Sequence, residues 1–151
     1  MKTTQNENKL FWDERARKFT GHSVSWPDVD MKSIEMKTVM EYIDENDHVI
    51  DIGCSNGQAT YEMQKVTKAS FLGVDYSKNS IKQAYHLKNG RLKFEFGDIL
   101  DMAEKHYEQF DKAVTIRCLI NLMNWQLQKK SLINVHKLLK PGGTFIMCEA
   151  F

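Results

Sequence analysis

The sequence predicts an α/β fold in which a doubly wound, mainly parallel sheet is covered by helices on both faces. Five short runs rich in β-branched and aromatic residues follow residue 47, with starts about twenty to thirty residues apart: 48–52, 70–74, 92–96, 112–116 and 144–148. Helical patterns lie between several of these runs. Strands that alternate with helices in this way form repeated βαβ units, and such units build a parallel sheet.

Two of the connecting segments carry clear helix signals. Ser77 is placed to cap a helix that buries Ile81, Ala84 and Tyr85. Asn124 is placed to cap a longer helix whose apolar residues follow the i, i+3, i+4, i+7 spacing: Leu132, Val135, Leu138 and Leu139. The sequence Pro141-Gly142-Gly143 should end that helix and turn the chain into the last strand. A shorter helix is expected around residues 102–108.

Residues 1–46 are expected to form helices that act as a lid and as cover for the sheet. One helix should span residues 8–19 and another residues 28–42, after Trp26-Pro27. The second helix carries an apolar face of Met36, Val39, Met40 and Ile43. Residues 47–151 then form the core, and 151 residues in total suit a single domain.

The composition excludes several classes of protein. With 21 Lys and Arg against 20 Asp and Glu, the net charge is +1, which provides no basic field for a nucleic acid. No apolar run approaches the roughly 20 residues that span a bilayer, and residues 1–9 lack the apolar stretch of a secretory signal. The three cysteines show no zinc-ligand spacing, so we expect no metal and a reducing, cytoplasmic environment.

The residues that follow the first three predicted strands suggest a ligand pocket, because ligands of open α/β sheets bind beyond the carboxyl ends of the strands. The first strand leads into the loop 51–57, of sequence DIGCSNG, whose glycines permit a sharp turn in front of a helix N-terminus. Asp75 ends the second strand, where a carboxylate can bind both hydroxyls of a ribose. Asp98 and Ile99 follow the third strand and could bind the amino group and the ring of a base. Together these residues outline a site for a ribonucleoside with a charged tail.

The loop is similar to a known cofactor-binding motif. The dinucleotide fingerprint G-x-G-x-x-G fits poorly, because Ser55 and Gln58 stand at its second and third glycine positions. A nicotinamide-dependent oxidoreductase is therefore the weaker alternative. The pattern D-x-G-x-S-x-G instead resembles motif I of the class I S-adenosylmethionine-dependent methyltransferases, usually D/E-x-G-x-G-x-G. Residues 73–77, 97–99, 110–114 and 138–143 resemble later motifs of this family in the correct order, the last with the sequence LLKPGG.

The resemblance covers roughly residues 47–149 and implies a Rossmann-like fold that binds S-adenosylmethionine and releases S-adenosylhomocysteine. The helix with Phe11, Trp12, Arg15 and Phe19 would fold over the cofactor as a lid; the alternative is that Phe11 and Phe19 pack on the edge of the sheet. The serine in the loop departs from the usual glycine, at small cost if its φ angle is negative. The cofactor-binding residues implied are Trp12, Asp51, Gly53, Cys54, Ser55, Gly57, Asp75, Tyr76, Asp98, Ile99, Ile116 and Arg117.

Residues after the fourth and fifth strands should face the methyl acceptor. Methyl transfer from a sulfonium needs mainly an aligned nucleophile and the exclusion of water. Asn121 and Glu149 are the candidate catalytic residues, with Glu149 as a base or an orienting group. The N/D-P-P-Y/F motif of nucleic-acid amino-methyltransferases is absent after residue 116, where the sequence is RCL. We therefore expect transfer to an O or N atom of a small polar molecule, with sugars among the candidates.

Two further expectations concern completeness. A complete class I methyltransferase has seven strands, whereas this chain contains five and lacks the C-terminal strand hairpin. An exposed fifth strand would favour pairing with another chain, so we expect a homo-oligomer through that edge, or instability. The alternative to an enzyme is a catalytically inactive, methyltransferase-like fragment that acts as a cofactor-binding or scaffold protein.

Overall fold

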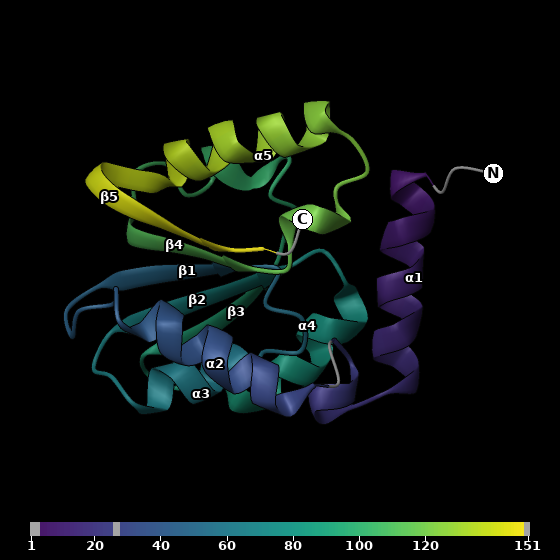
Figure 1. Cartoon of the computed structure of the whole chain (residues 1–151), viewed down its shortest axis with the longest axis horizontal. Helices are drawn as coiled ribbons and strands as arrows, with labels where there is room; N and C mark the ends of the chain where they lie inside the picture. Colours follow the sequence, from purple (N-terminus) through teal and green to yellow (C-terminus); the bar gives the residue numbers. More distant parts are fainter. Residues whose placement is uncertain (1–3, 26–27, 150–151) are drawn as a thin grey trace.

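A five-stranded parallel sheet forms the centre of the part of the chain that the computed structural model describes, residues 4–25 and 28–149. Its strand order is β3-β2-β1-β4-β5, and every neighbouring pair is parallel (Figure 1). The strands are β1 (His48–Ile52), β2 (Ser70–Asp75), β3 (Leu92–Phe96), β4 (Phe110–Ile116) and β5 (Leu139–Cys148). The predicted α/β fold is confirmed.

Helices cover both faces of the sheet and one end of it. They are α1 (Gln5–Lys18), α2 (Val29–Met40), α3 (Gln58–Lys65), α4 (Lys78–Ala84) and α5 (Trp125–Leu138). Figure 1 shows α5 on one face, α2, α3 and α4 on the other, and α1 standing across the carboxyl ends of the strands. Short 3₁₀ turns complete the chain at Gly21–Ser23, Tyr85–Leu87, Met102–Glu104 and Leu119–Asn121. None of the described helices is long and apolar enough to cross a membrane.

Alternating residues of the central strands divide the core in two. Ile50 and Leu72 point into the cluster beneath α5, where Val135 and Leu138 are buried. The preceding residues, Val49 and Phe71, point into a second cluster on the opposite face of the sheet, which also contains Val114 of β4. Both faces of β1 and β2 are buried, and the middle of each strand is therefore mostly apolar, whereas β3 at the edge alternates buried apolar residues with the more exposed Lys93 and Glu95. The apolar face predicted for α2 packs against the second cluster.

The predicted caps are confirmed, but some boundaries differ from expectation. The side chains of Ser77 and Asn124 accept hydrogen bonds from backbone N–H groups at the starts of α4 and α5. Helix α1 begins earlier than expected, because Thr4 forms a capping box with Glu7. The helix expected around 102–108 is only a 3₁₀ turn, Met102–Glu104. Trp26 and Pro27 lie outside the described residues.

Tyr85 was expected to be buried and is instead 48% exposed. The reason is that α4 ends at Ala84 and the chain continues as a 3₁₀ turn, which rotates Tyr85 off the apolar face of the helix.

The turn at residues 141–143 lies inside β5 and not before it. Phe110 pairs with Leu139 and Lys112 with Thr144, so β5 advances five residues while β4 advances two. The extra residues form an irregularity that holds Pro141 and the two glycines, with Gly142 at φ 80°. Helix α5 can therefore pass directly into the strand at Leu139.

We predict that Gly57→Ala destabilises the fold by more than 1 kcal/mol. Gly57 has φ 75°, and a Cβ there would lie 2.5 Å from the ring of Phe94. A left-handed alanine costs about 1–2 kcal/mol, and crowding a packed core adds about 1–3 kcal/mol. Gly90→Ala is the matched control, because a Cβ at Gly90 meets nothing within 4 Å. Equal urea-unfolding midpoints for the two variants would contradict this packing.

Candidate active site

The loop after β1 contains three residues in the left-handed region. Gly53, Ser55 and Gly57 have φ angles of 80°, 52° and 75°. The N–H groups of Gly53 and Cys54 both donate to the carbonyl of Val74, at 2.8 and 3.1 Å, and this fixes the loop to the end of β2. The negative φ that would make serine inexpensive is therefore not found, and Ser55 carries a backbone strain of about 1–2 kcal/mol.

The glycines of this loop are required by protein packing. A Cβ on Gly53 would lie 2.6 Å from Sγ of Cys118, so the absence of a side chain makes room for Cys118, the second residue after β4. Gly53 also lines the cavity described below. Gly57 does not: it is the N-cap residue of α3 and faces Phe94. A contact between Gly57 and a cofactor therefore stays a prediction.

Asp75, at the end of β2, connects the loop to the start of α4. Its Oδ2 accepts from the N–H of Ser55 at 2.9 Å, and its Oδ1 accepts from the N–H of Ser77 at 2.8 Å. Burial raises the pKa of Asp75 to about 6, although the two N–H donors favour the charged form. Each carboxylate oxygen keeps a further lone pair, so Asp75 can still accept hydrogen bonds from the hydroxyls of a ribose.

Asp51 is a second acid at this end of the sheet, and it is only 4% exposed. Its Oδ2 accepts a hydrogen bond of 2.6 Å from the hydroxyl of Thr60. Burial raises its pKa to about 6, opposed by that hydrogen bond and assisted by the charge of Asp75. The pKa of the Tyr76 hydroxyl is also raised, mainly by burial and then by Asp75. These groups share a poorly solvated environment.

A cavity of about 280 Å³ joins these residues, close to the lower end of the range typical of small-molecule sites, about 300–1,000 Å³. Nine of the twelve expected cofactor-binding residues line it: Trp12, Asp51, Gly53, Cys54, Ser55, Asp75, Tyr76, Ile116 and Arg117. The candidate acceptor-side residue Asn121 also lines it. The carboxylate of Asp75, with lone pairs to spare beside the glycine loop, fits the ribose of S-adenosylmethionine.

Asp98 and Ile99 do not belong to the cavity wall. Asp98 forms an ion pair with Lys9 of α1 and accepts a hydrogen bond from the N–H of Leu100. The side chain of Ile99 is 6% exposed and packs in the core beneath α5 with Leu100 and Met102. This corrects the expectation that Ile99 is available to an adenine ring, because its apolar surface is already buried in the protein.

Side chains of helix α1 bind to the segments that follow β2, β3 and β4. Asp13 accepts from the Ser77 hydroxyl at 2.7 Å and from the backbone and side-chain nitrogens of Asn79 at 3.1 and 2.8 Å. Although partial burial acts in the opposite direction, these donors lower the pKa of Asp13. The neighbouring residue on α1, Trp12, donates through Nε1 to Oδ1 of Asn121 at 3.1 Å. The helix therefore forms one wall of the cavity.

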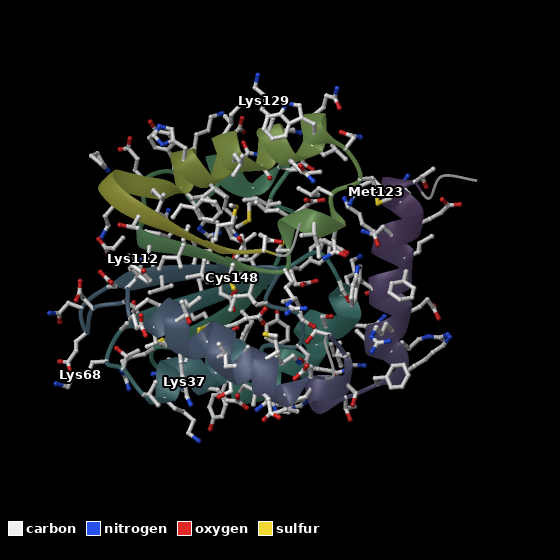
Figure 2. The ribbon with its side chains drawn as sticks, in the orientation of Figure 1. Lys37, Lys68, Lys112, Met123, Lys129 and Cys148 are labelled. Atoms are coloured by element: carbon white, nitrogen blue, oxygen red, sulfur yellow. The ribbon has the colours of Figure 1, made fainter. Side chains whose placement is uncertain are left out.

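The other aromatic residues of α1 lie away from the cavity. Phe11 is 56% exposed and Phe19 is 44% exposed, and neither lines the cavity. Arg15 stacks on the ring of Phe19 and donates to the carbonyls of Ser23 and Val24. Figure 2 shows Met123, at the loop before α5, beside α1; the N–H of Met123 donates to Gln5 Oε1 at 3.0 Å.

Helix α2 supplies a wall that the motif comparison missed. Lys32, Glu35 and Met36 all line the cavity. Glu35 Oε1 accepts from Arg117 Nε at 2.6 Å, while Arg117 itself is held at φ 52° with its N–H donating to the carbonyl of Cys148. The signal in the sequence is an acid on an apolar helix face, because Glu35 lies one turn before the buried Val39.

Glu149 has a different position from the one expected of a base. Its carboxylate accepts hydrogen bonds from the N–H groups of Cys118, Leu119 and Ile120, at 2.9, 3.0 and 3.2 Å. It thus caps the 3₁₀ turn after β4 and is not part of the cavity wall. Asn121 does line the cavity, but its side chain is already bonded to Trp12 and, through Nδ2 at 2.8 Å, to the carbonyl of Arg117.

The three cysteines gather near the same end of the sheet without forming a metal site. Cys54 and Cys118 line the cavity, and Cys148 ends β5 (Figure 2). Burial raises the pKa of both Cys54 and Cys118 well above the ordinary range, so the thiols are protonated near pH 7. Across residues 4–25 and 28–149, no group of three or more His, Cys, Asp or Glu side chains is placed to hold a metal ion.

The fold and the cavity define a class: a doubly wound α/β protein with a ligand site at the carboxyl ends of its strands, next to a glycine loop and an acid at the end of β2. Residues 43–151 match the family described as "Methyltransferase domain". This chain belongs to that family, the class I S-adenosylmethionine-dependent methyltransferases.

Individual relatives are distant and longer. The O-methyltransferase cnsE of Penicillium expansum is 23% identical over 110 residues, which cover 70% of this chain and 38% of that protein. The sterol 24-C-methyltransferase of Debaryomyces hansenii is 29% identical over 112 residues, which cover 71% of this chain and 29% of that protein. This chain thus spans less than half the length of either relative.

A solved structure shows the same fold at similar distance. Phosphoethanolamine N-methyltransferase 1 of Haemonchus contortus, in complex with phosphoethanolamine and S-adenosylhomocysteine, superposes with a TM-score of 0.70. The sequences are 18% identical, and the match covers 91% of this chain and 31% of that one. The names of these three proteins place the methyl group on oxygen, carbon and nitrogen, so family membership alone does not determine the acceptor atom.

We predict that Asp51→Asn is more stable relative to wild type at pH 7 than it is at pH 4. The raised pKa of about 6 means that the folded state holds the Asp51 proton more tightly than the unfolded state. Ionisation between pH 4 and pH 6 therefore costs the wild type stability, by about 1–3 kcal/mol. The difference in unfolding free energy between Asp51→Asn and wild type should grow over that interval in urea titrations.

Asp30→Asn, an exposed acid on α2, provides the matched control and should run parallel to the wild type over the same interval. A constant difference between Asp51→Asn and wild type from pH 4 to pH 6 would show that Asp51 ionises without a burial penalty.

We predict that Asp13→Ala loosens α1 without unfolding the sheet. The substitution removes the acceptor of three hydrogen bonds that attach α1 to the start of α4. Amide hydrogen exchange in residues 5–18 should become faster, while exchange in β1 and β4 should not change. Glu14→Ala is the control, because Glu14 pairs with Arg17 of the same helix. Unchanged protection of α1 in Asp13→Ala would contradict this role.

Proposed function

We propose that this chain binds S-adenosylmethionine and transfers its methyl group to an O or N atom of a small polar molecule. The observation that carries the proposal is the carboxylate of Asp75, which lines the cavity with acceptor capacity to spare beside the loop of Gly53 and Ser55. When bound, the cofactor supplies a methyl group already activated by the positive charge on sulfur.

The residues of the chain then have three tasks. Asp75 binds the ribose hydroxyls, and the backbone around Gly53 lies against the middle of the cofactor. Residues 1–46 act as a lid and as cover: α1 closes the strand ends through Asp13 and Trp12, while α2 covers the sheet. Closure excludes water, which matters because water competes with the acceptor for the methyl group.

On the acceptor side, we propose that the chain orients the nucleophile and leaves Glu149 as a structural cap. Three backbone N–H groups already occupy the Glu149 carboxylate. Asn121 lies in the cavity wall, where it links the lid to the turn after β4. An acceptor such as a sugar would meet this polar edge, and the near-neutral net charge of +1 favours a small acceptor over a nucleic acid.

We further propose that the protein acts in the cytoplasm and associates through β5. Within the described residues, β5 pairs only with β4, and Met147 is 48% exposed beside the unpaired edge. Open strand edges pair readily with a second chain or with further residues of the same chain. The family match favours S-adenosylmethionine over a nicotinamide cofactor. A cofactor-binding scaffold without turnover stays the second candidate, since both acceptor-side polar residues are already engaged within the protein.

We predict that calorimetry detects S-adenosylhomocysteine binding to the wild type and that Asp75→Asn weakens it on the order of 10- to 100-fold, because the ribose loses a charged acceptor. Asp101→Asn is the control: Asp101 is exposed and pairs with Lys130, and neither residue lines the cavity. Absence of binding by the wild type at millimolar ligand would overturn the proposal. Binding without methyl transfer to any small acceptor would favour the scaffold.

A further inference from the structure

The cavity contains a buried carboxylate oxygen that nothing in the described protein satisfies. Glu35 of α2 is 8% exposed and lines the cavity. Its Oε1 bonds to Arg117, but its Oε2 has no hydrogen-bond partner among the residues described. Buried charged acceptors are almost always hydrogen-bonded, because an unsatisfied one loses its hydration without compensation. The free oxygen of Glu35 therefore points to a donor on a ligand.

The order of the strands shows which part of a ligand reaches Glu35. In the sheet, β1 lies between β2 and β4. Asp75 ends β2, Gly53 follows β1, and Arg117 follows β4. A ligand whose ribose binds Asp75 and whose chain runs past Gly53 must bring its far end to Arg117 and to its partner Glu35. In S-adenosylmethionine, that far end is the amino-acid group.

The charges at this end of the cavity match an amino acid. Glu35 provides one negative charge, and Arg117 and Lys32 provide positive charges nearby. Lys32 is held in place by the carbonyl of His22 and the hydroxyl of Ser25, each at 3.0 Å. An α-amino acid carries an ammonium and a carboxylate two bonds apart, so its ammonium fits the free oxygen of Glu35 while its carboxylate faces the cations. A purely cationic or purely anionic group would meet repulsion from one of the two.

We propose that Glu35 Oε2 accepts a hydrogen bond from the α-ammonium of the cofactor, which makes α2 the element that recognises the amino-acid end. This inference rests on the proposed function, because it requires that S-adenosylmethionine occupy the cavity. It assigns a binding role to a residue outside the glycine loop and outside the strand ends.

The test is a two-by-two binding comparison by calorimetry. The proteins are wild type and Glu35→Gln; the ligands are S-adenosylhomocysteine and its analogue in which hydrogen replaces the α-ammonium. Loss of one charge-assisted hydrogen bond should weaken binding on the order of 10- to 100-fold. We expect that loss for the analogue on wild type and for S-adenosylhomocysteine on Glu35→Gln, and little further loss when both changes are combined.

The matched control is Glu41→Gln, an identical substitution at the exposed C-cap of the same helix, which should bind both ligands as wild type does. Equal affinity of Glu35→Gln and wild type for S-adenosylhomocysteine would overturn the inference and assign the ammonium to another acid such as Asp51. Equal weakening of both ligands by Glu35→Gln would overturn it as well, since that result indicates general damage to the cavity.

Two further outcomes separate a failure of this inference from a failure of the variant to fold and from a failure of the proposed function. The comparison of the two ligands on wild type alone keeps the inference testable if Glu35→Gln does not fold: equal affinities there would overturn it. If wild type binds neither ligand, the proposed function itself fails, a result distinct from normal binding that is insensitive to Glu35.

Discussion

The carboxylate of Asp75 is the contact on which the rest of the site depends. It lies at the end of β2, receives the N–H groups of Ser55 and Ser77, and so joins the loop after β1 to the helix after β2. Those two N–H groups keep a buried charge partly satisfied, yet burial still raises the pKa of Asp75 to about 6. The two hydrogen bonds fix the orientation of this carboxylate. Additional donors would stabilise its charge further, and the hydroxyl groups of a ligand can supply them.

The two walls of the cavity differ in how they are held. One wall consists of strand ends and the loop 53–57, which are anchored by the sheet and by close packing around Gly53 and Gly57. The other consists of α1, which attaches through polar side chains such as Asp13 and Trp12, and of α2, whose apolar face packs against the second core cluster. Polar attachments such as those of α1 open at lower cost than a sheet does, so displacement of α1 would require no change in the sheet.

Periodicity and strand-end residues were sufficient to predict the fold and most of the cavity. The apolar runs appear as strands in a parallel sheet, with boundaries shifted by a few residues, and the caps at Ser77 and Asn124 are where the side-chain chemistry requires them. Such features are local, because they depend on neighbours within a few residues. The position of Tyr85 and the long start of β5 were not predictable in this way, since both depend on where a helix stops against the sheet.

The sequence by itself determined the order of the elements and the presence of a glycine loop and two acids at adjacent strand ends, since a parallel sheet brings all carboxyl ends to one edge. Only the tertiary structure decided which of those residues line the cavity. Asp98 instead pairs with Lys9, the side chain of Ile99 packs in the core, and the carboxylate of Glu149 accepts from three N–H groups. Glu35, which belongs to no motif, is left with a free oxygen in the cavity. Availability depends on partners distant in the sequence, and only folding brings those partners together.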